Sequence, residues 1–362
     1  MKNLQSKIII SDQFSTFLSL FGDIFFDRKS ESVVVLCDQN TAHYCLPALQ
    51  EIIREKGLVW NVFVMNAGEE FKTLHQSQEM IQFLLQTGAT RNTVLINLGG
   101  GTVCDLGGFV ASVYKRGIPF LNLPTTLIAQ ADAAIGGKTG VNHLTIKNLI
   151  GTFHAPMAVG IFPQFLQTLP QQHWKSGLGE LFKYAMIGAD ISLQAISALQ
   201  PNNTQPLTGV IQEAVRFKTA IVDADPFEKG PRKVLNFGHT VGHAIESLAL
   251  ENNLGITHGE AVAAGVVAET YLSVEALDLN SSVLNKVSEF FLQHFSIQPE
   301  LTEDPARLLQ LMLHDKKNRS HDAIQPVLLS QNGEPRVNET VSQELITRSL
   351  VFLHELIQKR GG

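Results

Sequence analysis

Histidine side chains recur in the second half of the chain at spacings that suit a metal ion. In LNFGHTVGHAIES, residues 235–247, His239 and His243 are four residues apart, so a helix would place both on one face. A second cluster, HGEAV, begins at His258. Imidazole and carboxylate groups suit a zinc-type divalent ion, and three such ligands leave one position open for a substrate oxygen. Spacing alone nominates both His239 and His243 as ligands.

The segment GELFKY, residues 179–184, adds a carboxylate to these histidines. Glu180 and Lys183 lie three residues apart and share one face of the expected helix. For any one of these histidines, an ordinary hydrogen-bonded helix residue is a better interpretation than a metal ligand. Taken together, the three elements favour a metal centre.

A glycine-rich segment in the first half suits a phosphate-containing ligand. GGGTVCDLGG, residues 99–108, follows an apolar run and precedes an expected helix, where bare backbone amides can approach a pyrophosphate. The spacing departs from GxGxxG, because Cys104 stands where the third glycine belongs, so a tight structural turn is an equal alternative.

A second glycine-rich segment, IGGKTG, ends like a P-loop. The first glycine of GxxxxGKT would fall at Asp132, and this mismatch excludes a P-loop ATPase. Lys138 is better interpreted as an ammonium group available to an anion.

Basic residues recur beside glycine, asparagine or histidine, although the chain as a whole is acidic. A phosphorylated substrate needs such a clamp, whereas each residue alone fits an ordinary solvated surface charge. These residues are Arg116, Lys138, Lys147, Lys183, Lys218, Arg232, Lys316 and Lys317.

Composition limits the class of protein. The chain has 362 residues, enough for about two domains. Its 28 Lys and Arg against 34 Asp and Glu give a net charge of −6, which argues against a general nucleic-acid partner. No secretory signal and no apolar run long enough for a membrane span are present, so we expect a cytoplasmic protein. The three cysteines form no CxxC pair and indicate neither a disulfide framework nor a thiolate metal site.

The first 170 or so residues alternate short β-branched runs with amphipathic stretches. This rhythm predicts a mostly parallel sheet of a nucleotide-binding type. Ligands of such sheets lie beyond the carboxyl ends of the strands, which makes Asp38, the glycines after Asn97 and the turn Pro124–Thr126 candidates. The expected strands are Lys7–Ile10, Ser32–Cys37, Val62–Met65, Thr93–Asn97, Phe120–Leu123 and Val159–Phe162.

From Leu169 onward, apolar residues recur at helical spacing, which predicts a helical domain. An exception is Ile324–Leu329, a candidate short strand or hairpin arm before the turn-like QNG. We therefore expect two domains, residues 1–170 and 171–362, with a cleft between them. The expected helices are 178–187, 206–223, 240–250, 260–277, 282–294 and 341–358.

Four blocks of the chain, in order, together match a known pattern far more specifically than any single motif. They are GGGTVCDLGGF…YKRG at 99–117, LPTTLIAQADAAIGGKTGVNH…KN…G at 123–151, GLGELFKY at 177–184, and EKGPRKVLNFGHTVGHAIE with HGEAV at 228–262. In these blocks the chain resembles the 3-dehydroquinate synthases of the shikimate pathway.

The resemblance implies a Rossmann-like α/β NAD-binding domain followed by a mainly α-helical metal-binding domain, with the active site between them, usually in a homodimer. It implies Glu180, His239 and His258 as ligands of zinc, cobalt or another divalent cation. His243 then becomes a general acid/base rather than a fourth ligand, and Glu228 a proton acceptor. The implied catalytic residues are His243, Glu228, Lys183, Lys138 and Asp132.

The resemblance also implies substrate and cofactor contacts. Those to the substrate are Arg116, Asp132, Lys138, Asn148, Lys218, Arg232, Asn236, His243 and either Lys316 or Lys317. Those to NAD are Asp38, Asn40, Glu69, Lys72, Gly100, Gly101, Thr102, Asp105, Thr125, Thr126, Lys147 and Thr168.

The implied reaction converts 3-deoxy-D-arabino-heptulosonate 7-phosphate to 3-dehydroquinate and phosphate. It proceeds by transient oxidation with NAD, phosphate elimination, reduction and intramolecular aldol closure. We expect a phosphorylated small molecule as substrate, and neither nucleic acid nor a membrane as partner.

Three alternatives stay open at this point. Another sugar phosphate cyclase, such as a 2-epi-5-epi-valiolone synthase, would use the same cofactors, but Lys218, Asn236 and His243 together favour 3-dehydroquinate synthase. A metal-dependent polyol dehydrogenase would release NADH and would have no use for the basic clamp. A non-catalytic relative is disfavoured because every expected ligand and acid/base group is present.

Overall fold

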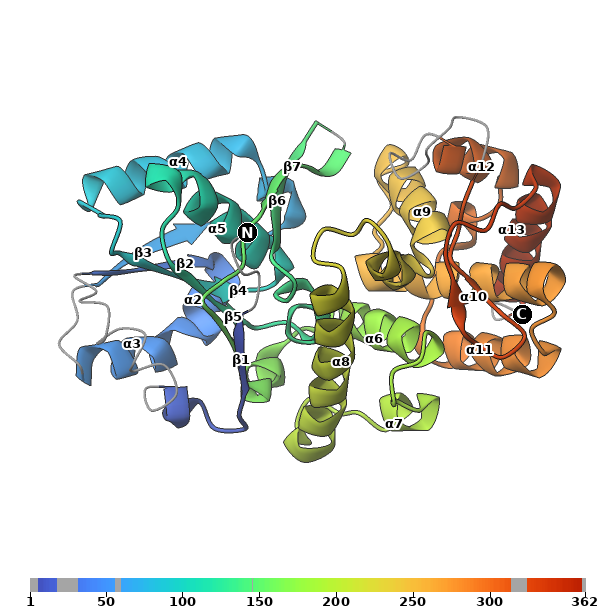
Figure 1. The fold of residues 1–362 in the computed structure, drawn as a ribbon, viewed down its shortest axis with the longest axis horizontal. Coiled ribbons are helices and arrows are strands. Elements are labelled where there is room, and N and C mark those ends of the chain that lie inside the picture. Colours follow the sequence, from blue (N-terminus) through green and yellow to red (C-terminus); the bar gives the residue numbers. More distant parts are fainter. Residues whose placement is uncertain (1–5, 18–31, 56–59, 145, 314–323, 360–362) are drawn as a thin grey trace. The chain divides into compact units, whose positions relative to one another are not determined.

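The computed structural model divides into two compact units (Figure 1). Unit 1 comprises Met1–Pro170 and Leu199–Phe227, and unit 2 comprises Gln171–Ala198 and Glu228–Gly362. The first segment of unit 1 thus ends at Pro170. The prediction put Leu199–Phe227 in the second domain, whereas the structure puts this segment in unit 1. The reason is that its helix packs on elements of unit 1. The residues described are 6–17, 32–55, 60–144, 146–313 and 324–359.

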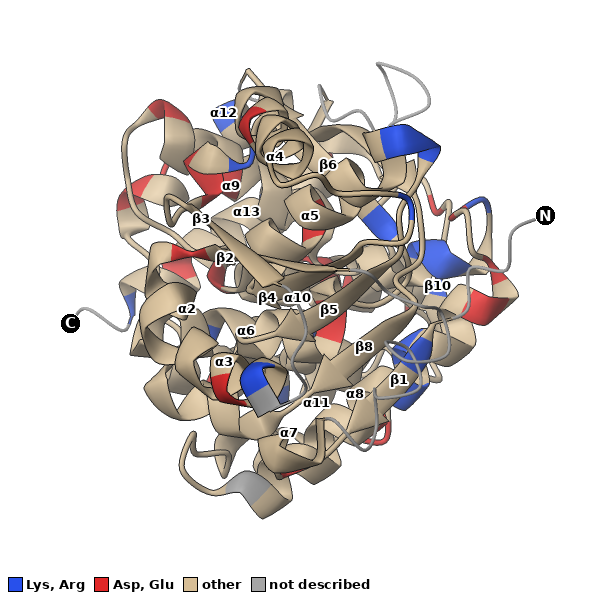
Figure 2. Cartoon of the chain, turned by 90° about the vertical axis from the view of Figure 1, so that its left-hand side faces the viewer, with Lys and Arg blue, Asp and Glu red and all other residues tan. Residues whose placement is uncertain are grey.

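Unit 1 is built on a six-stranded parallel sheet with the order β1-β8-β5-β4-β2-β3. Each strand begins and ends within two residues of a predicted run, which confirms the α/β fold of the first half. Figure 2 shows this sheet, and its central strands β4 and β5 carry no charged residue. The strands are β1 (Lys7–Ile10), β2 (Val33–Asp38), β3 (Trp60–Met65), β4 (Val94–Gly99), β5 (Phe120–Pro124) and β8 (Ala158–Ile161).

Both faces of the sheet are covered, as the near-continuous apolar strands require. Alternation along β2 sends Val33 and Val35 to one face and Val34 and Leu36 to the other. Helix α3 packs on the first face, and α4 and α5 pack on the second. Within the described part of unit 1, the α-helices are α2 (Gln39–Tyr44), α3 (Leu46–Glu55), α4 (Leu74–Gln86), α5 (Gly101–Val113) and α8 (Thr204–Ala224).

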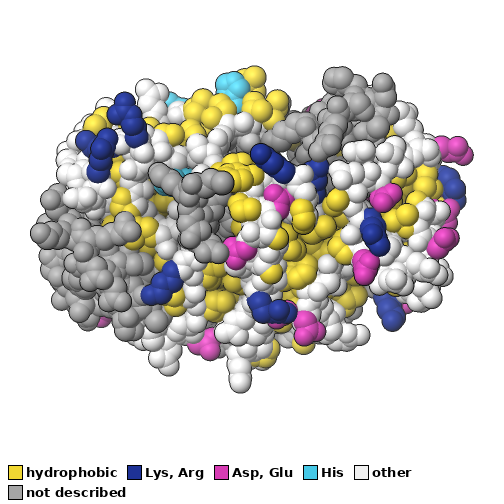
Figure 3. All heavy atoms as spheres, in the orientation of Figure 1, with side chains coloured by type: hydrophobic (Ala, Val, Ile, Leu, Met, Phe, Trp, Pro, Cys, Tyr) yellow, Lys and Arg dark blue, Asp and Glu magenta, His cyan; other side chains and the backbone are white. Residues whose placement is uncertain are grey.

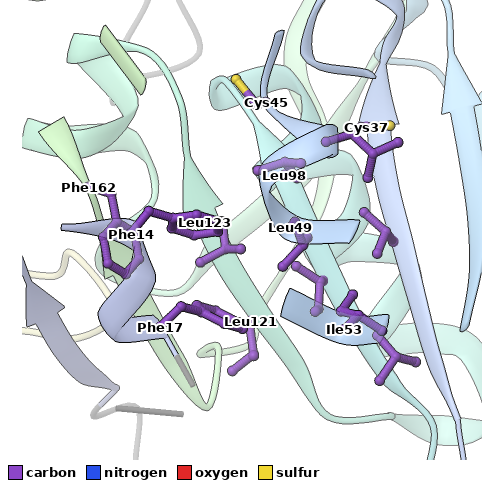
Figure 4. Packing of buried hydrophobic residues seen from close by; sticks show 14 of the residues in the cluster. Phe14, Phe17, Cys37, Cys45, Leu49, Ile53, Leu98, Leu121, Leu123 and Phe162 are labelled. Atoms are coloured by element: carbon purple, nitrogen blue, oxygen red, sulfur yellow. The ribbon is translucent and has the colours of Figure 1, made fainter. Parts of the chain in front are cut away.

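The core beneath the first face is aromatic at one end and aliphatic at the other (Figure 4). Phe14 packs edge-on against Phe162, with ring centroids 4.9 Å apart. Leu49 and Ile53 of α3 fill the other end of the cluster. This core fixes the strands whose carboxyl ends carry the predicted cofactor residues.

The three cysteines, Cys37, Cys45 and Cys104, are free and buried. Burial raises the pKa of the Cys37 and Cys45 thiols to about 12, and the nearby Asp38 carboxylate adds to the effect. These thiols are therefore neutral packing groups at physiological pH.

An antiparallel hairpin in unit 1 was not predicted from the sequence. It consists of β6 (Lys138–His143) and β7 (Ile146–Phe153). Most of β7 is exposed, including the apolar side chains of Leu149 and Phe153. A strand without a buried face has no alternating apolar pattern, so the periodicity that revealed the other strands is missing here.

Unit 2 is helical, as predicted, and is organised around α10 (His258–Leu277). This helix contacts α6, α9, α11 and α13, and residues Gly259–Thr270 are all buried. Such a helix lies inside the domain rather than on its surface. The others are α6 (Gln171–Met186), α7 (Leu193–Ser197), α9 (His239–Glu251), α11 (Ser281–His294), α12 (Pro305–Leu313) and α13 (Gln343–Gln358).

The candidate strand at Ile324–Leu329 is confirmed in its last two residues. There, β9 (Leu328–Leu329) pairs with β10 (Pro335–Arg336) across the QNG turn. Ile324 forms an isolated bridge with Val341.

Charged side chains of both signs are interspersed on the face shown in Figure 3. In unit 2, Arg307 pairs with Glu251 and Arg348 pairs with Glu275, at partly exposed positions. Within the described residues, every helix is too short or too polar to cross a membrane.

The contact between α10 and the start of α9 predicts a stability effect. A Cβ at Gly265 would overlap the carbonyl oxygen of Gly238, so Gly265→Ala forces the two backbones apart. We expect a loss of about 1–3 kcal/mol in the free energy of unfolding, measured by denaturant titration.

Gly255→Ala is the matched control, because a Cβ there meets nothing within 4 Å. We expect its unfolding free energy to stay within about 0.5 kcal/mol of the parent. Equal stability of the two variants would contradict the close backbone contact.

Candidate functional site

Three helices of unit 2 bring Glu180, His239 and His258 together. Glu180 lies on α6, His239 is the first residue of α9 and His258 is the first residue of α10. Nε2 of His258 lies 3.3 Å, and Nε2 of His239 3.6 Å, from Oε1 of Glu180. One ligand atom from each residue lies within 4.8 Å of the other two. The three residues that the family resemblance nominated thus form one cluster.

Glu180 is fully buried, yet it keeps its negative charge. Burial raises the pKa of its carboxyl group, but the ammonium of Lys183 and the imidazole of His258 outweigh this and lower the pKa to about 2. Lys183 forms an ion pair with Glu180 and lies over the ring of Tyr184. A buried anion of this kind favours a cation beside it.

His258 lies between two carboxylates. Burial lowers its pKa, but Glu246 and Glu180 outweigh this and raise the pKa to about 10. Its Nδ1 is 3.0 Å from Oε2 of Glu246, so its two ring nitrogens face different carboxylates. A metal ion bound at Nε2 would take the place of a proton there.

Close helix packing positions these side chains. A Cβ at Gly179, next to Glu180, would overlap the carbonyl oxygen of Gly259, next to His258. The backbones of α6 and α10 therefore touch beside two of the three candidate ligands.

A buried carboxylate fixes the third candidate ligand. Glu269 of α10 accepts hydrogen bonds from the amides of Gly238, Thr240 and Val241, with N–O distances of 2.7, 3.0 and 3.4 Å. These are donors that the start of a helix leaves without partners. Glu269 thus holds the turn that carries His239, and it was missed in the sequence because its partners are backbone amides.

His243 lies one turn after His239, with ring centroids 5.3 Å apart. It belongs to a second cluster, with Glu246 and His258, that overlaps the first at His258. Spacing alone nominated His239 and His243 equally, whereas only His239 shares the cluster with Glu180. The acid/base role of His243 stays a prediction.

The donor set fits a zinc-type ion. Two imidazoles and one carboxylate converge, and the Nδ1 atoms of both imidazoles are engaged elsewhere, His239 with the carbonyl of Phe237 at 3.1 Å. Two nitrogens and an oxygen suit zinc or cobalt and leave a position for substrate.

The segment before α9 holds further predicted residues. Nδ2 of Asn236 donates to Oε1 of Glu228 at 2.8 Å, which joins a predicted substrate contact to the predicted proton acceptor. Glu228 has a left-handed backbone, with φ of 57°, and Arg232 is buried. Lys316 and Lys317 lie outside the described residues.

In unit 1, the predicted glycine-rich turn lies at the carboxyl edge of the sheet. Strand β4 ends at Gly99, and α5 begins at Gly101 with its first amides at this edge. A Cβ at Gly100 would lie 3.0 Å from Cγ2 of Thr126, so the turns after β4 and β5 are in contact. Bare amides at a helix start and a close-packed turn fit a pyrophosphate group.

A charge cluster around the buried Lys72 lies beside this turn. Nζ of Lys72 is 2.7 Å from Glu69 and 3.2 Å from Asp105, and Thr102 donates to Glu69 at 2.7 Å. Burial raises the pKa of both carboxyls; Lys72 and neighbouring donors outweigh this at Glu69 and lower its pKa, whereas the pKa of Asp105 stays raised. Four predicted NAD contacts thus form one network.

Asn142 joins this network to the hairpin, and it was not predicted. Its Nδ2 donates to Oε1 of Glu69 at 3.0 Å, and its Oδ1 accepts the amide of Asn148 at 2.9 Å. The backbone amide of Asn142 also donates to the carbonyl of Lys72 at 2.7 Å. One side chain therefore links a predicted cofactor contact to a predicted substrate contact.

Asp132 and Lys218 also meet. Nζ of Lys218 on α8 donates to Oδ1 of Asp132 at 2.6 Å and to its carbonyl at 2.8 Å. The turn that carries Asp132 is held by the buried Asn122, which donates to the carbonyl of Ala134 at 3.2 Å and accepts from Asn97 at 2.9 Å. Sequence motifs showed Asp132 but not these supports.

The remaining predicted residues of unit 1 lie on several separate elements. Asp38 caps α2 by accepting the amide of Thr41 at 2.8 Å. Arg116 has a left-handed backbone with φ of 66°. The others are Asn40 on α2, Thr125 after β5, Lys138 on β6, Lys147 on β7 and Thr168 before α6.

Comparison with known families agrees with this geometry. A model described as 3-dehydroquinate synthase N-terminal matches residues 62–176, and one described as 3-dehydroquinate synthase C-terminal matches residues 177–318. The chain belongs to the 3-dehydroquinate synthase family. Among curated members of the 3-dehydroquinate synthase family, the enzyme of Parabacteroides distasonis is 36% identical over 353 residues, covering 97% of this chain and 98% of that protein.

Solved structures share the fold. The 2-epi-5-epi-valiolone synthase from Streptomyces hygroscopicus, with NAD⁺ and Zn²⁺ bound, has a TM-score of 0.84 at 24% identity and covers 98% of both chains. A 2-deoxy-scyllo-inosose synthase complexed with carbaglucose-6-phosphate, NAD⁺ and Co²⁺ has a TM-score of 0.80 at 24% identity and covers 95% of both chains. The chain thus shares its fold with both of these synthases.

The bonds of Asn142 predict a change in backbone protection. In Asn142→Ala, the amide of Asn148 loses its acceptor and Glu69 loses a donor. A hydrogen bond contributes about 0.5–1.5 kcal/mol, so we expect amides of the hairpin to exchange roughly 3–10-fold faster in hydrogen–deuterium exchange.

Asn203→Ala, at an exposed position of unit 1, is the control and is expected to leave hairpin exchange unchanged. Unchanged exchange in both variants would show that Asn142 does not hold the hairpin.

Proposed function

We propose that this chain is a 3-dehydroquinate synthase, which converts 3-deoxy-D-arabino-heptulosonate 7-phosphate to 3-dehydroquinate and phosphate. The observation that carries the proposal is the convergence of Glu180, His239 and His258 in a chain that matches curated 3-dehydroquinate synthases over nearly its whole length. The reaction oxidises carbon 5 transiently, eliminates phosphate, reduces the ketone and closes the ring by an aldol step.

Two bound groups support this chemistry. Glu180, His239 and His258 would hold a zinc or cobalt ion, which would lower the pKa of the substrate hydroxyl at carbon 5. Residues at the carboxyl edge of the unit 1 sheet would hold NAD, which would accept a hydride and give it back within one turnover. Cyclases of the same fold have been solved with NAD⁺ and with Zn²⁺ or Co²⁺, which supports the assignment.

The chain's own residues bind the substrate and move protons. His243, with its ring 6.0 Å from that of His258, exchanges a proton with the substrate hydroxyl. Glu228 accepts a proton, and its bond to Asn236 fixes its carboxylate. The ammonium of Lys183 forms an ion pair with the buried carboxylate of Glu180 and so keeps this carboxylate ionised.

The remaining cationic and polar residues form the proposed clamp for the substrate's phosphate and carboxylate. Lys218 is oriented by Asp132, and Asn148 by Asn142. Hydrogen bonds from cationic side chains suit a phosphate dianion. The clamp comprises Arg116, Lys138, Asn148, Lys218, Arg232, Asn236 and either Lys316 or Lys317.

We further propose that the enzyme acts as a homodimer in the cytoplasm. The homodimer is what the family resemblance implies, and the cytoplasm is the expectation of the sequence analysis. Neither nucleic acid nor a membrane is part of the proposed function.

The decisive experiment measures phosphate release with catalytic NAD⁺. With 3-deoxy-D-arabino-heptulosonate 7-phosphate we expect release that EDTA abolishes and zinc restores, without accumulation of absorbance at the NADH band. The cofactor is regenerated within each turnover, so no NADH should build up.

Sedoheptulose 7-phosphate, offered in parallel, separates the alternatives. Release from this sugar phosphate alone would move the chain to the valiolone-type cyclases. Release from neither, together with NADH formation from a polyol, would replace the proposal by a dehydrogenase.

A further inference from the structure

Glu246 is a buried carboxylate that the proposed chemistry does not use and that contacts a candidate metal ligand. Its side chain on α9 is only 7% exposed, and its Oε2 lies 3.0 Å from Nδ1 of His258. Burying a carboxylate is costly unless it is paired. The pairing here is with a candidate metal ligand, on the side of the ring away from Glu180.

The two candidate histidine ligands are oriented by different kinds of partner. Nδ1 of His239 lies 3.1 Å from the carbonyl of Phe237, which is main chain two residues away. Nδ1 of His258 faces a side chain from another helix. Only the second arrangement can be removed by a substitution.

The backbone of His258 is fixed independently of Glu246. His258 begins α10, and the capping box of Thr257 and Glu260 closes that helix start. The capping box leaves the imidazole free to rotate about its side-chain bonds. A hydrogen bond at Nδ1 restricts this rotation and selects the tautomer whose Nε2 lone pair points to the metal.

We propose that Glu246 is a positioning residue of the metal centre. Its carboxylate accepts the Nδ1–H of His258 and directs Nε2 toward the carboxylate of Glu180, so that the three ligand atoms are arranged before the metal binds. The proposal deepens the proposed function, since it concerns the same centre.

The test measures the affinity of the full-length chain for zinc by competition with a chromophoric chelator. Partners that orient ligating histidines contribute about 10–100-fold to metal affinity. We expect Glu246→Ala to raise the Kd for zinc by that factor. Glu246→Gln, whose amide oxygen still accepts from Nδ1–H, is expected to lose less.

Glu251→Gln is the matched control on the same helix. Glu251 is exposed and pairs with Arg307, far along α9 from the ligands. Its zinc affinity is expected to equal that of the parent. Far-ultraviolet circular dichroism of every variant checks that the helices are intact, and the Glu246→Gln variant keeps the test valid if Glu246→Ala does not fold.

Three results would overturn the proposal. The first is a Kd for Glu246→Ala within twofold of the parent, and the second is an equal loss of zinc affinity in the alanine and glutamine variants. The third is a second zinc ion that the parent binds and the Glu246 variants do not, which would make Glu246 a ligand in the cluster with His243. Because zinc alone is titrated, these results are distinct from a failure of the proposed function, which appears as no phosphate release by the parent chain.

Discussion

The close contact of three helix backbones is the constraint on which the metal centre depends. Glu180 follows Gly179, and His258 precedes Gly259, at a point where a Cβ on either glycine would overlap the other helix. Since side chains do not separate the helices, the carboxylate and imidazole meet directly. Larger residues would move the helix axes apart by more than the tolerance of a coordination site.

The metal centre also depends on partners that compensate the buried carboxylates in the interior of unit 2. The buried carboxylates around the cluster include Glu180, Glu246 and Glu269. Their partners are Lys183 for Glu180, an imidazole for Glu246, and three backbone amides for Glu269. Breaking one pair leaves a charge uncompensated in a medium of low polarity, which is far more costly than losing an exposed pair. Ligands and supports therefore form one unit.

The periodicity of apolar residues was sufficient to predict the strands of the sheet and most helices, because the apolar faces of these elements are buried. It failed for the hairpin Lys138–Phe153, whose second strand is largely exposed, and for the place of Leu199–Phe227, which depends on long-range packing. The candidate ligands were found through motifs. Glu246, which supports the candidate ligand His258, and Asn142, which supports Glu69 and Asn148, act through contacts that no local spacing encodes.

X-ray absorption spectroscopy of the zinc-loaded chain tests the central claim most directly, because it counts the imidazoles bound to the ion. The cluster of Glu180, His239 and His258 predicts two imidazole nitrogens with oxygen donors completing the shell, at about 2.0–2.2 Å. A third imidazole would make His243 a ligand and remove its acid/base role. A shell without imidazole would contradict the assigned centre altogether.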